Sequence, residues 1–249
     1  MRSFRILVLM VMTAMSLPMI ADSEAGLILG AEVEKELNRK LDFDFGVEMR
    51  TRNDFRTIDR WDVGLATSFK FNKWLRASGG YNMLYTNFRE KITYNVAGLR
   101  NKWRPSYWGV KHRFNLAVTG TYKFGNNIRL SLRERWQYTY RPGKTVQRWD
   151  FSDFLWEDHA RSTRGKNQLR SRFQIEYDKK RALFTPYASI EFYHSWGIEK
   201  IRYTAGTDIH FNKKHALTVF YRYQNMRNVD EDDYNPDMHY LSAGYKFKF

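Results

Sequence analysis

The chain has 249 residues, a formal net charge of +15 and no cysteine, and aromatic residues make up 17% of it. Its basic side chains are spread at strand spacing over the whole length instead of clustering, which argues against a nucleic-acid partner. After the N-terminal segment, no apolar run is long enough to cross a membrane as a helix. A polar average with many aromatics is typical of a membrane-spanning β-barrel, and a soluble all-β domain is the alternative.

The first 21 residues have the features of a secretory signal peptide. Arg2 and Arg5 supply the positive charge that precedes an apolar stretch over residues 6–15, and small residues suited to cleavage follow. We predict cleavage after Ala21, or as late as Ala25. The remaining residues, 22–249, are predicted to form a single outer-membrane β-barrel domain.

Alternation of apolar and polar residues then predicts eleven strands. In chain order these are 26–37, 41–51, 60–71, 74–86, 109–124, 128–140, 167–177, 182–194, 198–211, 215–225 and 239–249. The ten strands from residue 41 onward give the even number that bacterial barrels favour. The first strand would then run in the odd direction, so it either pairs at the closure or is matched by a strand hidden in a loop.

Two residues fit this pattern poorly. Glu134 falls on the apolar face of its strand, where a β-bulge would re-aim it. Pro186 falls inside a strand, where it cannot donate to a ladder of hydrogen bonds.

The links between strands alternate between short and long. Four of the short links carry a related motif, in Glu36-Leu-Asn-Arg39, Lys70-Phe-Asn-Lys73, Lys123-Phe-Gly-Asn126 and His210-Phe-Asn-Lys213. The two longest links, 87–108 and 141–166, are predicted to be loops. Tight periplasmic turns and longer extracellular loops are typical of outer-membrane barrels. We therefore predict a transmembrane, antiparallel, up-and-down β-barrel of about ten to twelve strands, integral to the bacterial outer membrane and surrounded by its lipid.

The last predicted strand ends on an aromatic residue at the C-terminus. Tyr245, Phe247 and Phe249 share its apolar face. It resembles the closing strand of bacterial outer-membrane barrels, in which this pattern is the address read by the barrel assembly machinery. The machinery could recognise this strand by pairing with its exposed edge, as in other cases in which an extended segment adds a strand to a sheet.

The mature chain also resembles a family of uncharacterised, porin-like outer-membrane barrels, domain of unknown function 2490 (DUF2490). The resemblance covers nearly all of residues 26–249. The stretches that carry it are Arg60-Trp-Asp-Val-Gly64 with Phe69-Lys-Phe-Asn-Lys73, Gly79-Gly-Tyr81, Arg133-Glu-Arg-Trp-Gln-Tyr-Thr-Tyr140, Leu169-Arg-Ser-Arg172 and the closing strand. These are strand and turn motifs, so they imply architecture and an outer-membrane location. The resemblance implies no catalytic residues.

The same alternation predicts which side chains line the lumen. The inward carboxylates are predicted to be Asp42, Asp44, Glu48, Asp62, Glu176, Glu191 and Asp208. The predicted lumen-lining arginines are Arg50, Arg60, Arg76, Arg113, Arg129, Arg133, Arg135, Arg170, Arg172, Arg202 and Arg222. Such side chains either pair and fill a narrow barrel or line an electropositive passage for small anionic solutes. In the first case, the barrel would be structural or would bind a partner through its long loops.

Evidence for an enzyme is weaker. The pairs Asp42 and Asp44, and Asp208 and His210, have spacings similar to those of omptin-type outer-membrane proteases. Both pairs abut short turns, at the end opposite to that of omptin-type sites. We therefore predict no catalytic residues, and enzymatic activity stays an open question.

Other candidate motifs also favour simpler explanations. His194 and Ser195 could suggest a hydrolase, but adjacent strand residues point to opposite faces. The acidic run 230–233 lacks the spacing of a calcium loop. There is no glycine-rich phosphate loop and no zinc spacing, so we predict neither a cofactor nor a metal.

Overall fold

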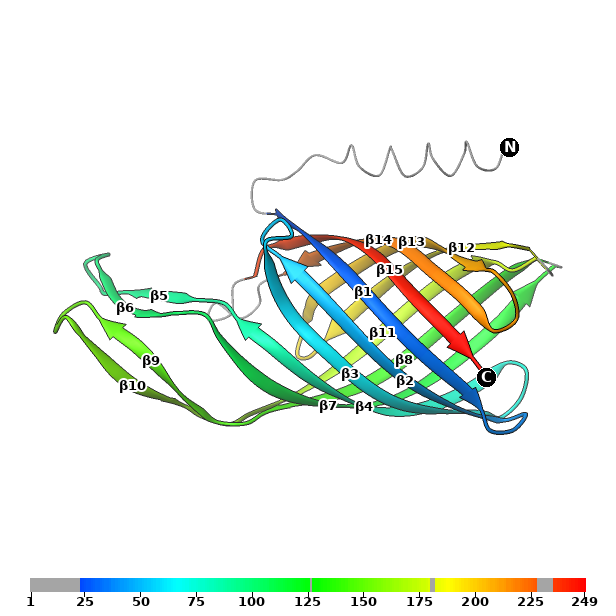
Figure 1. Cartoon of the computed structure of the whole chain (residues 1–249), viewed down its shortest axis with the longest axis horizontal. Helices are drawn as coiled ribbons and strands as arrows, with labels where there is room; N and C mark the ends of the chain where they lie inside the picture. The colour runs from blue at the N-terminus through cyan, green and yellow to red at the C-terminus, as the bar shows by residue number, and fades with distance from the viewer. Residues whose placement is uncertain (1–22, 126, 180–181, 228–234) are drawn as a thin grey trace.

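The computed structural model describes residues 23–125, 127–179, 182–227 and 235–249. They form a closed barrel with a second sheet projecting from one end (Figure 1). Within the described residues, no helix is long and apolar enough to cross a membrane. The predicted signal peptide lies outside the described residues.

Eleven strands close the barrel in the order β1-β15-β14-β13-β12-β11-β8-β7-β4-β3-β2. Their bounds are β1 (Ser23–Glu36), β2 (Leu41–Arg52), β3 (Thr57–Lys70), β4 (Leu75–Phe88), β7 (Tyr107–Phe124), β8 (Ile128–Arg141), β11 (Arg164–Tyr177), β12 (Phe184–His194), β13 (Ile198–His210), β14 (His215–Met226) and β15 (Asp237–Lys248). The predicted barrel is therefore confirmed, with boundaries close to those expected from alternation.

The first and last barrel strands form the closure. Eleven strands of alternating direction begin and end pointing the same way, so the closing pair must be parallel. Residues 23–34 of β1 indeed pair in parallel with residues 237–248 of β15, while β1 and β2 are antiparallel. Of the two roles left open for the first strand, pairing at the closure is the correct one, and it gives the otherwise antiparallel barrel its one parallel pair among the described strands.

Alternation places apolar side chains outside the barrel and polar ones inside. Exposed outward residues of β8 include Leu130, Leu132 and Trp136. A strand of 14 residues, such as β8, spans about 33 Å when tilted by about 45°. This matches a hydrocarbon layer of about 30 Å. The outer surface therefore has the height and polarity expected of a membrane-facing wall.

The short turns depend on an asparagine. The side-chain oxygen of Asn72 accepts hydrogen bonds from the backbone N–H groups of Trp74 and Leu75, at 2.8 and 2.9 Å. Asn38 and Asn212 make the equivalent pairs of bonds in their own turns. Such bonds satisfy backbone donors that a tight turn leaves free. The repeated turn motif in the sequence therefore has a structural cause.

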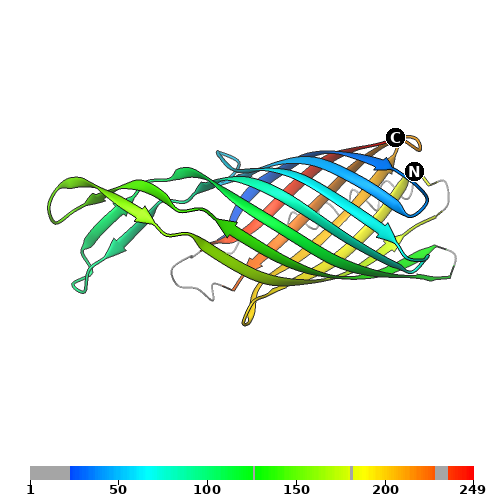
Figure 2. The ribbon, with the colours of Figure 1, turned by 90° about the horizontal axis from the view of Figure 1, so that it is seen from below.

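The two longest predicted loops are largely strands, which corrects the prediction for 87–108 and 141–166. They form β5 (Lys91–Tyr94), β6 (Arg100–Arg104), β9 (Lys144–Asp150) and β10 (Leu155–Arg161). These strands pair in the order β10-β9-β6-β5 as a sheet that extends beyond the barrel (Figure 2). Because neither face of this sheet is uniformly apolar, its strands lack the alternation that marks the barrel strands.

The two residues that fit poorly are accommodated without a bulge. The register of β8 is continuous on both sides, so the bulge expected at Glu134 is absent. Glu134 stays on the outward face, where the hydroxyl of Ser171 donates to it at 2.7 Å. Pro186 pairs only with Thr207 of β13, because the β11 ladder begins at Tyr187. Its missing N–H therefore costs no hydrogen bond to β11.

Candidate functional site in the arginine-lined lumen

The barrel encloses a cavity of about 580 Å³ lined by inward-facing residues. Five carboxylates line it: Glu32, Asp44, Glu48, Asp62 and Glu191. Eleven cationic side chains line it: Arg50, Arg60, Arg113, Arg133, Arg135, Arg170, Arg172, Lys200, Arg202, Arg222 and Lys246. The lining therefore carries a formal net charge of +6.

Nine of the eleven arginines named from the sequence line this cavity. The other two, Arg76 and Arg129, lie nearer the short turns, where carboxylates engage them. Arg76 lies 4.0 Å from Asp42. Arg129 hydrogen-bonds Glu176 and lies 3.6 Å from Asp178. These two arginines therefore lie beside carboxylates outside the cavity.

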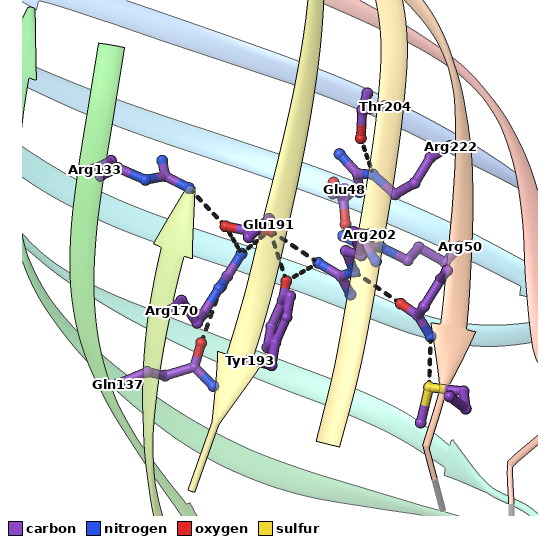
Figure 3. Close-up of polar contacts among 12 residues, drawn as sticks. Glu48, Arg50, Arg133, Gln137, Arg170, Glu191, Tyr193, Arg202, Thr204 and Arg222 are labelled. Atoms are coloured by element: carbon purple, nitrogen blue, oxygen red, sulfur yellow. Dashed lines mark hydrogen bonds and ion pairs between the residues drawn. The ribbon is translucent and has the colours of Figure 1, made fainter. Parts of the chain in front are cut away.

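Glu191 is the hub of a network that joins β8, β11, β12 and β13 (Figure 3). One nitrogen of Arg170 donates to both carboxylate oxygens at 3.0 Å, and Arg133 donates to one of them at 3.0 Å. The hydroxyl of Tyr193 donates to the same carboxylate at 2.9 Å. Arg202 lies 3.8 Å away and hydrogen-bonds the Tyr193 hydroxyl. Three guanidinium groups thus share one carboxylate, and the network keeps an excess of positive charge.

Three cations, of which only Lys200 lies outside the Glu191 network, surround the ring of Tyr193. Arg170, Lys200 and Arg202 lie 4.5, 4.0 and 4.6 Å from its centroid. The face of an aromatic ring attracts such cations. Tyr193 is 2% exposed, so it narrows the lumen at this level.

Several other cations have no carboxylate within ion-pair distance among the described residues. They are Arg60, Arg113, Arg135, Arg172, Lys200 and Arg222. The Nε atoms of Arg60, Arg135 and Arg172 are buried and have no hydrogen-bond partner. A buried polar group without a partner is costly, and a bound anion would satisfy it. The cavity lining therefore contains positively charged hydrogen-bond donors that lack an acceptor.

Sequence reasoning missed several lining residues, among them Glu32 and Lys246, and also Lys200 and Tyr193, which contact each other. Lys200 lies two positions before Arg202 on β13 and so shares its face. Extending the alternation to lysine and tyrosine would have found both, because Tyr193 likewise lies two positions after Glu191.

Members of the protease-like pairs have other partners in the structure. Asp42 forms an ion pair with Lys70 at 2.9 Å. Asp208 accepts a hydrogen bond from Thr218 at 2.6 Å, and His210 hydrogen-bonds Thr185. Each of these groups is thus occupied by a neighbour on an adjacent strand. This is the pattern of paired side chains that support the barrel wall.

The remaining candidates have local partners too. The Ser195 hydroxyl donates to the backbone oxygen of Asn167 at 2.8 Å. The acidic run 230–233 lies outside the described residues. Near the short turns, oxygens of Glu32, Glu34 and Asp44 lie within 4.8 Å of one another. Lys246 contacts the first two at 2.6 and 2.5 Å, so a lysine already occupies this acidic group.

A family model described as "Protein of unknown function (DUF2490)" matches residues 26–235. The β domain of the Bordetella autotransporter BrkA is similar in structure, with a TM-score of 0.48 and 13% identity over 76% of this chain and 79% of that chain. The CymD monoaromatic hydrocarbon channel gives a TM-score of 0.41 and 7% identity over 78% of this chain and 66% of that chain. No curated protein matches the sequence. At these values, neither structural likeness carries information about function.

Proposed function

The chain belongs to the DUF2490 family, whose description assigns no activity, and we propose from its lumen that it forms a narrow passage for small anionic solutes through the bacterial outer membrane. The observation that carries this proposal is the cavity lining, with a formal net charge of +6 and buried guanidinium donors that lack partners.

The proposed location rests on the outer wall and the last strand. Apolar residues cover the outward positions, and β15 carries Tyr245 and Phe247 on its outward face, with Phe249 directly after its end. In the closed barrel, β15 pairs with both β1 and β14. The edge of β15 is therefore free to pair with another strand only before the barrel closes. The assembly machinery would recognise β15 at that stage. Insertion into outer-membrane lipid would follow.

The proposed selectivity rests on electrostatics. A low-dielectric wall that carries one sign of charge focuses its field into the passage. Rings of arginine or lysine are the usual lining of anion pores. Arg113 and Arg135 project from neighbouring strands into the cavity without a carboxylate partner. An entering anion would exchange part of its hydration for these donors, whereas the net positive charge of the lining would repel a cation.

Solute flux into liposomes tests this proposal. Purified chain reconstituted in liposomes should admit a small carboxylate faster than a neutral solute of equal size, and a cationic solute slowest. Heat-modifiable migration on a gel shows that the reconstituted barrel is folded. Equal rates for the three solutes with a folded barrel would contradict the proposal.

The Glu191 network favours a second candidate, a structural barrel with a filled lumen. Its hydrogen bonds join four strands, and Tyr193 occupies the space between them. A barrel sealed in this way would admit none of the three solutes. Its role would then lie in the projecting sheet, which is free to contact an external partner.

A further inference from the structure

Three tryptophans from neighbouring strands of the projecting sheet meet on one of its faces. Trp103 of β6 pairs with Trp149 of β9, and Trp149 pairs with Trp156 of β10. The ring centroids of Trp149 and Trp156 are 5.5 Å apart, and those of Trp103 and Trp156 are 5.8 Å apart. We call these three residues the tryptophan row.

The tryptophan row lies on the side of the sheet that continues the outer wall of the barrel. The opposite face carries Glu157, which lies 2.9 Å from Lys102. Arg161 is four positions after Glu157 on β10 and so shares its face. Arg161 lies over the rings of Phe88 and Tyr107, which project inward from β4 and β7. The charged face therefore continues the lumen wall, and the tryptophan row continues the membrane-facing wall.

The row lies beyond the level of the hydrocarbon layer. The 14 residues of β8, which end at Arg141, already match the thickness of a bilayer. Trp149 follows eight residues later, which corresponds to about 26 Å of extended chain. Figures 1 and 2 show the sheet continuing past the end of the barrel. In an outer membrane, the layer next to this face is the saccharide of the outer-leaflet glycolipid.

The side chains around the row suit a sugar. Trp156 is 48% exposed, so its ring is available for contact. Gln147 and Asp158 pair across β9 and β10 two positions from the tryptophans, on the same face, and hydrogen-bond each other. Each keeps a free amide or carboxylate atom for a hydroxyl group. Apolar ring surface beside a few fixed polar groups is the usual composition of a small-molecule site.

We infer that the tryptophan row binds the core saccharide of outer-leaflet lipopolysaccharide. The apolar C–H faces of the sugar rings rest on the indoles, and hydroxyl groups bond to Gln147 and Asp158. The inference rests on the proposed outer-membrane location and is independent of the anion passage, because the row and the lumen lie on opposite sides of the wall. Contact with the glycolipid would fix the projecting sheet against the membrane surface.

Binding by the purified full chain in detergent tests the inference. The probes are lipopolysaccharide that carries only lipid A and the core saccharide, and lipid A alone. The wild-type chain should bind the core-bearing probe about tenfold more tightly than lipid A, as expected for stacked aromatic contacts. Trp156→Ala should lose most of that difference, and free core oligosaccharide should compete.

Trp74→Ala is the matched control. Trp74 is 56% exposed and lies at the opposite rim, so its loss should leave the preference for the core unchanged. Equal binding of lipid A and the core-bearing probe would overturn the inference, as would an unchanged preference in Trp156→Ala.

The same variants, assayed for solute flux, separate this inference from the anion passage. Trp156→Ala should lose core binding and keep the wild-type flux. A wild-type chain without anion flux that still binds the core would contradict only the passage.

Discussion

Arg133 and Arg135 lie on one face of β8 yet have different surroundings, and this difference makes a sharp test. Arg133 donates to Glu191 at 3.0 Å, with side chains that are 15% and 9% exposed. Arg135 has no carboxylate within ion-pair distance among the described residues, whereas the buried Nε atoms of both arginines lack a partner. Replacing Arg133 with Gln should therefore cost stability, whereas replacing Arg135 with Gln should leave stability unchanged or raise it by relieving repulsion.

The magnitudes follow from these contacts. A buried hydrogen bond to a charged group contributes about 1.5–3 kcal/mol, and Arg133→Gln should lower the free energy of unfolding by roughly the lower figure, because Arg170 still holds Glu191. For Arg135, an anion about 8 Å from the guanidinium gains about 2 kcal/mol at an effective dielectric constant of about 20. Salt at 0.1 M reduces this to about 1 kcal/mol. The same guanidinium disfavours a cation by a similar free energy, so the difference between anion and cation is about 2 kcal/mol. Arg135→Gln should therefore lower the anion-to-cation permeability ratio by up to about thirtyfold.

Two assays read out these variants. Reversible urea unfolding in lipid gives the free energy of unfolding, and the reversal potential across planar bilayers gives the permeability ratio. Lys73→Gln removes the same charge from a short turn outside the cavity and is the matched control. The reasoning is refuted if Arg135→Gln leaves the ratio at the wild-type value, or if it destabilises the barrel as much as Arg133→Gln.

Other predictions concern assembly, processing and pH. Deleting Tyr245–Phe249 should abolish outer-membrane assembly, and membrane-embedded, heat-modifiable protein after this deletion would contradict the assigned role of the last strand. Mass spectrometry of the mature chain should find Glu24 retained, which requires cleavage at the earlier candidate site, because Arg89 holds both oxygens of this carboxylate at 2.7 Å; a mature chain that starts after Ala25 would refute this. In the projecting sheet, the hydrogen bond from a lysine lowers the pKa of Glu157. A lowered pKa stabilises the fold above the unfolded-state value of about 4 and loses that effect as the pH falls below it. Protection factors for amide hydrogen exchange in β9 and β10, which are corrected for the intrinsic exchange rate at each pH, should therefore fall below about pH 4 while those of the barrel strands are retained, and unchanged protection factors would count against the ion pairs.

The barrel can be predicted from the sequence because the features that define each strand and turn lie within a few residues of one another. Each barrel strand must present apolar groups to one side and polar groups to the other, and this period of two is visible in β2 and β8 without knowledge of their neighbours. The turns are equally readable, since Asn38 and Asn72 satisfy backbone donors a few residues away. Inward placement of arginines follows from the same alternation.

What the sequence could not supply depends on contacts between distant segments. The parallel closure requires that β1 and β15 meet, although more than 200 residues separate them. Arg133 pairs with Glu191, a residue 58 positions away in the sequence. This contact distinguishes Arg133 from Arg135, although the two arginines look equivalent in the sequence. The projecting sheet was missed because apolar and polar residues do not alternate along its strands.

The central claim is that the lumen passes small anions, and the reversal potential of the wild-type chain in a planar bilayer tests it most directly. With a tenfold gradient of potassium chloride across the bilayer, an electropositive lumen predicts a stable conductance whose reversal potential lies toward the equilibrium potential of chloride. A reversal potential toward that of potassium would contradict the account, as would a bilayer that stays silent while the protein in it is shown to be folded.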